Sequence, residues 1–132
     1  MQAMNLRKEQ TAFLSDVCKL IQFASAQSLE LTGGELYRTL EQQKIYFNAG
    51  KTKTMNSLHL RRLAIDFNFF KNDEMTFSKN LLQPLGDYWE SLHPFNSWGG
   101  NGIKFVDMPH FSRGVGSPEF KRITDKGVNN VP

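Results

Sequence analysis

The N-terminal part of the chain has a helical pattern of apolar positions. The pattern is carried by Leu6, Phe13, Val17, Leu20, Ile21 and Ala24. Side chains at this spacing lie on one face of a helix, so the pattern predicts an amphipathic helix over residues 6–26. The segment Leu29-Glu30-Leu31-Thr32 then predicts a short strand, which the pair Gly33-Gly34 ends.

Local end signals predict a second, shorter helix. Thr39 and Gln42 have the spacing of a capping box, in which both side chains satisfy free amides at a helix start. Gly50 suits the left-handed conformation that often ends a helix, so the helix is expected to run to Ala49. Residues 51–56 are polar and without periodicity, and are expected to form a loop.

Residues 64–70 alternate between apolar and polar side chains. Ile65, Phe67 and Phe69 point to one face of a strand, whereas Asp66 points to the other. The pattern predicts a strand with one face on the core and Asp66 on the opposite face.

A third helix is predicted over residues 78–92, which carry several leucines and two aromatic residues. Pro84 implies either a kink or a late start with Pro84 in the first turn, and Pro94 closes the element.

The C-terminal third predicts one more strand and then a tail. Residues 103–111 have a strand-like pattern that Pro109 interrupts, and residues 114–132 offer few core candidates. We therefore expect a single domain over residues 1–113 and a loosely ordered tail over residues 114–132. Helices and strands are segregated, which favours an α+β fold with a small antiparallel sheet and helices packed on one side.

Composition limits the classes of protein. A length of 132 residues fits one domain, and the net charge of +3 would favour encounter with an anionic polymer. Cys18 is the only cysteine, which excludes an internal disulfide and a thiolate metal cluster. The N-terminus lacks the apolar stretch of a secretory signal, and no segment approaches the ~20 apolar residues of a membrane span. We therefore expect synthesis in the cytoplasm and no membrane insertion.

Histidines and carboxylates form a candidate metal site. Asp66 follows His59 by seven residues, and His110 follows Asp107 by three. Two imidazoles and one carboxylate, from His59, Asp66 and His110, would leave a fourth tetrahedral position on a zinc ion open for water. Asp107 could then move a proton, and Arg38 could stabilise a developing oxyanion.

Spacing alone leaves a structural alternative open. His59 would then be a loop histidine, Asp66 a hydrogen-bonding residue at a strand end, and His110 a satisfied histidine between Pro109 and Phe111.

Three segments resemble a known family. Residues 57–66, Ser-Leu-His-Leu-Arg-Arg-Leu-Ala-Ile-Asp, resemble the Ser-x-His-x-x-Gly-x-Ala-x-Asp motif of the D-alanyl-D-alanine carboxypeptidase and L-alanyl-D-glutamate endopeptidase family. Residues 98–101, Trp-Gly-Gly-Asn, with Asp-Met-Pro-His-Phe at 107–111, resemble its second motif. Residues 37–39, Tyr-Arg-Thr, with Gln42 or Gln43, resemble its upstream segment.

The resemblance implies roles for these residues. The zinc ligands would be His59, Asp66 and His110, with Asp107 as the catalytic base and acid and Arg38 as the residue that binds the substrate. Ser57 would support the ligands, and Trp98 and Gln42 would belong to the substrate cleft. The implied fold is a small antiparallel sheet with helices on one side, shared with lysostaphin-type peptidases and the hedgehog signalling domain.

Two positions depart from the family pattern. Arg62 stands where the family usually has glycine, and Gly102 stands where a second tryptophan is common. Both departures bear on the fit of the substrate more than on the metal ligands.

The resemblance implies a peptidoglycan hydrolase with one zinc ion that cuts the L-Ala–D-Glu bond of the stem peptide. A phage or prophage endolysin, released through a holin pore and acting on the wall as a monomer, fits a short chain without a signal. A D-Ala-D-Ala carboxypeptidase and a non-catalytic zinc-containing wall-binding domain are the alternatives. Nucleic acid is not an expected partner, because the chain lacks a basic helix and a clustered aromatic platform.

Overall fold

The computed structural model describes residues 5–114. The tail predicted for residues 114–132 lies, apart from Gly114, outside the described residues and stays a prediction. Along the chain the elements are α1 (Leu6–Ala26), β1 (Glu30–Gly33), α2 (Leu40–Asn48), η1 (Leu58–Arg61), β2 (Ala64–Lys71), β3 (Glu74–Met75), α3 (Lys79–Leu92), β4 (Asn96–Trp98), η2 (Gly99–Asn101) and β5 (His110–Arg113).

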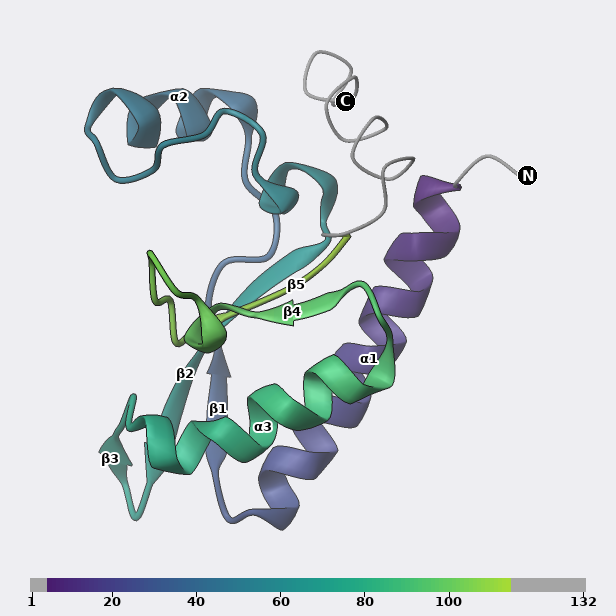
Figure 1. Ribbon diagram of the computed structural model, residues 1–132, viewed down its shortest axis with the longest axis vertical. Coiled ribbons are helices and arrows are strands. Elements are labelled where there is room, and N and C mark those ends of the chain that lie inside the picture. The colour runs from purple at the N-terminus through teal and green to yellow at the C-terminus, as the bar shows by residue number, and fades with distance from the viewer. Residues whose placement is uncertain (1–4, 115–132) are drawn as a thin grey trace.

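The strands form one antiparallel sheet. Its order is β1-β2-β5-β4, and the short β3 pairs with β2 beside this path. Helices α1 and α3 pack against each other and on the sheet, whereas α2 lies apart from them near the start of β2 (Figure 1). The predicted α+β class, with an antiparallel sheet and helices on one side, is confirmed.

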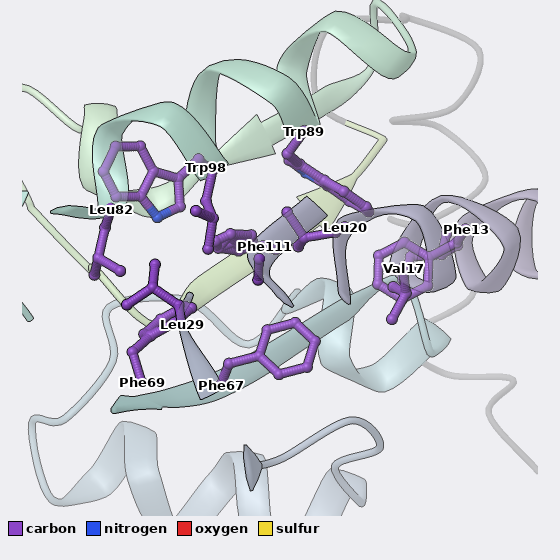
Figure 2. Close-up of a cluster of buried hydrophobic side chains, with 13 residues drawn as sticks. Phe13, Val17, Leu20, Leu29, Phe67, Phe69, Leu82, Trp89, Trp98 and Phe111 are labelled. Atoms are coloured by element: carbon purple, nitrogen blue, oxygen red, sulfur yellow. The ribbon is translucent and has the colours of Figure 1, made fainter. Parts of the chain in front are cut away.

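The core lies between the sheet and the two packed helices. Phe111 of β5 is fully buried at its centre, and its ring contacts Phe67, Phe69, Trp89 and Trp98 at centroid distances of 5.9–6.2 Å (Figure 2). Helix α1 adds Phe13, Val17 and Leu20 to this cluster. Since His110 precedes Phe111 on the same strand, the strand alternation that buries Phe111 turns His110 to the opposite face.

A buried polar network joins α1 to the far end of the sheet. The Arg113 Nε–H donates to Glu9 Oε2 at 2.7 Å, and Arg113 Nη1 lies 3.7 Å from Asp16 Oδ2. The Asn96 side-chain amide donates to the same Asp16 oxygen at 3.1 Å. Arg113 is 5% exposed, and the carboxylates of Glu9 and Asp16 compensate its buried positive charge.

The predicted helices agree closely with the observed ones. Helix α1 has the predicted bounds, and Asn5 caps it by accepting from the Lys8 amide. Thr39 caps α2 through the Gln42 amide, and Gly50 has the left-handed backbone expected of it, with φ +75°. Helix α3 starts at Lys79, so Pro84 lies inside it and the alternative of a late start at Pro84 is wrong.

The strand predicted over residues 103–111 is wrong for most of its length. Only residues 110–113 form a strand, and the preceding segment is a loop closed on Gly99, whose carbonyl accepts from the amides of Gly102 and Asp107. A carbonyl that binds both ends of a segment holds it as a turn and keeps it off the sheet. The strand β4, which pairs with β5, was not predicted from the sequence.

Within residues 5–114, no helix is both long enough and apolar enough to cross a membrane.

Candidate metal centre and groove

The pairing of β2 with β5 brings Asp66 and His110 together. The two residues are direct partners in the antiparallel register, although 44 residues separate them in sequence. Directly paired residues project to the same face of a sheet with Cβ atoms about 5 Å apart. The His110 Nδ1 lies 3.2 Å from Asp66 Oδ1 on the face opposite the aromatic core.

His59 reaches the same point from the 3₁₀ turn η1, just before β2. Ser57 caps this turn, because its Oγ accepts from the His59 amide at 3.2 Å. The buried His59 ring places Nδ1 3.1 Å from the Leu36 carbonyl and Nε2 3.5 Å from Asp66 Oδ2. A carbonyl can only accept, so Nδ1 carries the proton in the neutral ring and the Nε2 lone pair faces Asp66.

The three side chains suit a divalent metal ion. One donor atom from each of His59, Asp66 and His110 lies within 4.8 Å of the other two. Neighbouring donors around a tetrahedral zinc, each ~2.1 Å from the ion, are about 3.4 Å apart, close to the 3.5 Å between His59 Nε2 and Asp66 Oδ2. A nitrogen lone pair and a carboxylate that face each other at this distance repel unless a cation lies between them, which is either a proton that makes a hydrogen bond or a metal ion. The donor set therefore suits a zinc ion by its chemistry, and the His59–Asp66 distance matches the donor spacing of a tetrahedral site.

The two histidines keep Asp66 in its charged, ligating form. Burial raises the pKa of Asp66, but the hydrogen bonds with His110 and His59 outweigh burial and hold this pKa well below its ordinary value. A carboxylate that stays ionised near neutral pH is the form a metal requires.

Asp107 lies beside this centre on the loop before β5. Its amide donates to the Gly99 carbonyl at 2.9 Å, and its carbonyl accepts from the His110 amide at 3.2 Å. Burial raises the pKa of the Asp107 carboxyl; the nearby His110 opposes this shift and the charge of Asp66 adds to it. A carboxyl with a raised pKa is suited to taking up and releasing a proton.

The Trp-Gly-Gly segment is a structural support for Asp107. The Trp98 indole is 1% exposed, and its N–H donates to the Met108 carbonyl at 2.9 Å. A Cβ on Gly86 or Gly100 would lie 2.0 or 2.1 Å from the Trp98 ring, so only glycine fits on either side. Trp98 therefore borders the groove mainly as part of its buried wall.

Arg38 lies on the other side of the centre with most of its donors occupied. Its Nε–H donates to Glu35 Oε1 at 2.6 Å and Nη2 pairs with the same carboxylate, while Nη1 donates to Gln43 at 2.8 Å and to Ser57 at 3.4 Å. These contacts account for four of the five N–H donors of an arginine. The fixed guanidinium keeps one donor for a further partner.

The structure brings Gln43, rather than the predicted Gln42, to Arg38. Gln43 is fully buried and joins Arg38 to the Thr54 carbonyl, whereas Gln42 is part-exposed and its amide serves the cap of α2. The resemblance allowed either Gln42 or Gln43 to belong to the upstream segment. Their spacing from Arg38 along the chain does not show which of the two contacts it.

Sequence reasoning missed Glu35. Its carboxylate orients Arg38 and lies 3.8 Å from His59 Nδ1, and its carbonyl accepts from the Asp66 amide at 2.9 Å. The spacing of three residues between Glu35 and Arg38 was the available signal, although such pairs are common. Gly34 before it is also needed, because a Cβ there would lie 2.9 Å from the Asp66 carbonyl oxygen.

The two departures from the family pattern have structural explanations. Arg62 has a left-handed backbone with φ 56°, which is the reason glycine suits this position, and its guanidinium stacks 4.0 Å from the centroid of the Tyr37 ring. A Cβ on Gly102 would lie 1.8 Å from the Phe105 carbonyl oxygen, so this turn of the loop requires glycine.

A groove of about 810 Å³ passes over the centre. Its lining includes all three candidate ligands, together with Arg38, Ser57, Trp98 and Asp107. Ligand-binding clefts in proteins commonly have volumes of about 300–1,000 Å³. The structure therefore brings together every predicted site residue except Gln42, which is not among the lining residues.

Comparison with known proteins agrees with this arrangement. The sequence model of the D-alanyl-D-alanine carboxypeptidase family matches residues 50–113, which hold all three candidate ligands and Asp107. The L-alanyl-D-glutamate peptidase of Listeria phage A118 is 29% identical over 118 residues. This match covers 86% of the chain and 42% of the phage protein, so the chain spans less than half the length of that relative.

Two solved structures share the fold. The L-Ala D-Glu endopeptidase ChiX of Serratia marcescens superposes with a TM-score of 0.62 at 19% identity, over 85% of this chain and 88% of that one. The vancomycin-resistance D,D-pentapeptidase VanY, solved in complex with Zn(II), superposes with a TM-score of 0.50 at 15% identity, over 90% of this chain and 80% of that one. The chain is therefore similar in sequence to D-alanyl-D-alanine carboxypeptidases and to an L-alanyl-D-glutamate peptidase, and it has the fold of the two solved peptidases.

Proposed function

We propose that this chain is a zinc-dependent peptidase that hydrolyses the L-Ala–D-Glu bond of bacterial peptidoglycan stem peptides. The observation that carries the proposal is the convergence of His59, Asp66 and His110 under a groove that Asp107 also lines. The Listeria phage relative supports the choice of bond and a role as a phage or prophage endolysin. Action on the wall as a monomer after release through a holin pore is part of the same proposal.

His59, Asp66 and His110 would hold one zinc ion. When bound, the ion would act as a Lewis acid toward the scissile carbonyl and lower the pKa of a water molecule toward neutrality. The fold of VanY, a zinc-containing protein, supports this choice of metal.

Asp107 would move the proton during hydrolysis. As the oxygen of a water molecule bonds to the carbonyl carbon, its proton passes to the Asp107 carboxylate. The carboxyl then gives this proton to the leaving nitrogen as the C–N bond breaks, which returns Asp107 to its starting state. The raised pKa of Asp107 favours this exchange, because the carboxyl holds a proton more readily than an exposed aspartate does.

Arg38 would hold the substrate against the centre. Glu35 and Gln43 fix its guanidinium in place, and the remaining N–H can donate to a carbonyl or carboxylate oxygen of the peptide. A donor that is positioned before the reaction stabilises the developing negative charge without further ordering.

A terminal D-Ala carboxypeptidase is the second candidate, because the matching family model carries that description. Mass spectrometry of digested peptidoglycan separates the candidates. New D-Glu amino termini support the endopeptidase, whereas released D-Ala identifies the carboxypeptidase. Intact peptidoglycan after incubation with the zinc-loaded protein would overturn both and favour a wall-binding domain. The variant Asp107→Asn, with its zinc content measured, serves as the inactive control.

A further inference from the structure

The charged side chains of the groove are divided between its two walls. Asp66, Glu90 and Asp107 come from the sheet, α3 and the loop before β5. The positive charges, Arg38 and Lys51, come from the segments on either side of α2. The groove is therefore acidic toward the sheet and basic toward α2.

Most of these charges are already engaged by neighbours. Glu35 pairs with Arg38, and both oxygens of Glu90 accept hydrogen bonds, from the Trp98 amide at 2.9 Å and from the Asn101 side chain at 3.1 Å. Lys51 differs, because no carboxylate within residues 5–114 forms an ion pair with it. Its Nζ lies 5.8 Å from the centroid of the Tyr46 ring, close enough for a weak cation–π contact.

The backbone that carries Lys51 is fixed relative to Arg38. The Lys51 amide donates to the Tyr46 carbonyl at 2.9 Å, directly after the left-handed turn at Gly50. Three residues on, the Thr54 carbonyl accepts from Gln43 Nε2 at 2.7 Å, and Gln43 also binds Arg38. Lys51 is thus an exposed residue on an anchored loop, and it is among the residues that line the groove.

We propose that Lys51 is a specificity-determining residue that binds a free carboxylate of the peptide substrate. The inference rests on the proposed function, since it concerns the peptide that occupies the same groove. A stem peptide offers two such groups besides its C-terminus: the α-carboxylate of D-Glu and the side-chain carboxylate of diaminopimelate. An ammonium without a carboxylate partner in the groove is complementary to either.

The expected size of the effect follows from exposure. Ion pairs between exposed groups contribute up to about 1 kcal/mol, which is roughly a fivefold change in affinity, and salt screens them. Replacing Lys51 should therefore raise KM and Kd about three- to fivefold at low salt and change kcat less than twofold. Arg38 and the metal centre are left untouched by the replacement.

The test compares Lys51→Gln with Lys53→Gln and with Lys51→Arg. Lys53 is also exposed on the same loop and is not among the residues that line the groove, so Lys53→Gln removes the same charge at a position that should not matter. Binding is measured by calorimetry in the Asp107→Asn background, and cleavage is measured in the wild-type background. The ligand is the C-terminally amidated tetrapeptide L-Ala-γ-D-Glu-diaminopimelate-D-Ala, which has no chain-end carboxylate.

Two further peptides identify the carboxylate. One carries the α-amide of D-Glu, and the other has lysine in place of diaminopimelate. The peptide whose affinity no longer depends on Lys51 lacks the group that Lys51 binds. If dependence on Lys51 persists when both groups are removed in one peptide, the inference is wrong.

The outcomes separate this inference from the proposed function. Weaker binding with Lys51→Gln, restored by Lys51→Arg and absent with Lys53→Gln, supports it, even if the wild-type protein fails to cleave the peptide. If the wild-type protein cleaves the peptide but Lys51→Gln and Lys53→Gln have equal KM and Kd values, only the role of Lys51 is overturned. A peptide that does not bind the zinc-loaded protein overturns both.

Discussion

Gly99 offers a direct test of how the groove positions Asp107. A Cβ added at Gly99 would lie 2.2 Å from the Asp107 carbonyl oxygen, whereas ordinary contacts of a Cβ begin at 3.4 Å. In Gly99→Ala, the backbone at Asp107 must therefore retreat by about 1 Å. This shift strains two backbone hydrogen bonds of Asp107. In one, the Asp107 N–H donates to the Gly99 carbonyl, and in the other, the Asp107 carbonyl accepts from the His110 N–H.

The magnitude follows from the size of the shift. A displacement of ~1 Å at a catalytic group costs about 100-fold in rate, and overpacking of this kind costs about 1–3 kcal/mol of the free energy of unfolding. Gly99→Ala should therefore lose about two orders of magnitude in kcat/KM while it still folds and binds close to one zinc per chain. Cleavage of a stem peptide by chromatography, guanidinium unfolding and metal analysis measure the three quantities.

Gly33→Ala is the matched control, because a Cβ at Gly33 has no atom within 4 Å and the backbone φ there is not positive. It should leave both rate and stability near the wild-type values. A folded Gly99→Ala variant that cleaves at the wild-type rate would refute the idea that this contact positions Asp107.

Three further predictions follow from the same structure. Asp66→Asn should lower zinc affinity at least tenfold by competition with a chelating dye, whereas Asn68→Ala, on the same face of β2, should not. Arg62→Val should lower the free energy of unfolding by about 1–2 kcal/mol, because a β-branched residue resists the left-handed backbone, while Arg62→Gly should be near neutral; equal values for both would contradict this. Burial and the charge of Arg113 lower the pKa of His93 in the folded state, and the His93 Nδ1 accepts a hydrogen bond from the Phe95 amide. The unfolded chain therefore binds a proton at His93 more readily than the folded one, so the free energy of unfolding should fall as pH drops through about 6.5, the pKa of histidine in an unfolded chain. His93→Asn keeps a side-chain acceptor without titrating, so its urea-unfolding midpoint should lose less between pH 7 and 5 than that of the wild type.

Local sequence signals predicted most of the helices. The apolar spacing of residues 6–26, the Thr39 cap and the turn at Gly50 act within a few residues, so they do not depend on the rest of the fold. The strand carrying Asp66 was also predicted, because alternation of buried and exposed side chains is itself a local pattern.

The strand predicted over residues 103–111 shows where local patterns fail. Ile103, Phe105 and Val106 are apolar, yet they are exposed, because the Gly99 carbonyl closes the segment into a loop before pairing begins at His110. The unpredicted strand β4 has only three residues and exists through its pairing with β5. Neither the closure of this loop on Gly99 nor the strand β4 leaves a periodic pattern in the sequence.

The sequence by itself determined the helices, the strand with Asp66 and, through the motifs it shares with a known family, the candidate ligands. Only the tertiary structure decided that His59, Asp66 and His110 meet, that Gln43 rather than Gln42 reaches Arg38, and that Trp98 is a buried support. The physical reason is register. A slip of one residue between β2 and β5 would turn His110 into the core and Phe111 into the groove, and that register is fixed by packing between residues far apart in the chain.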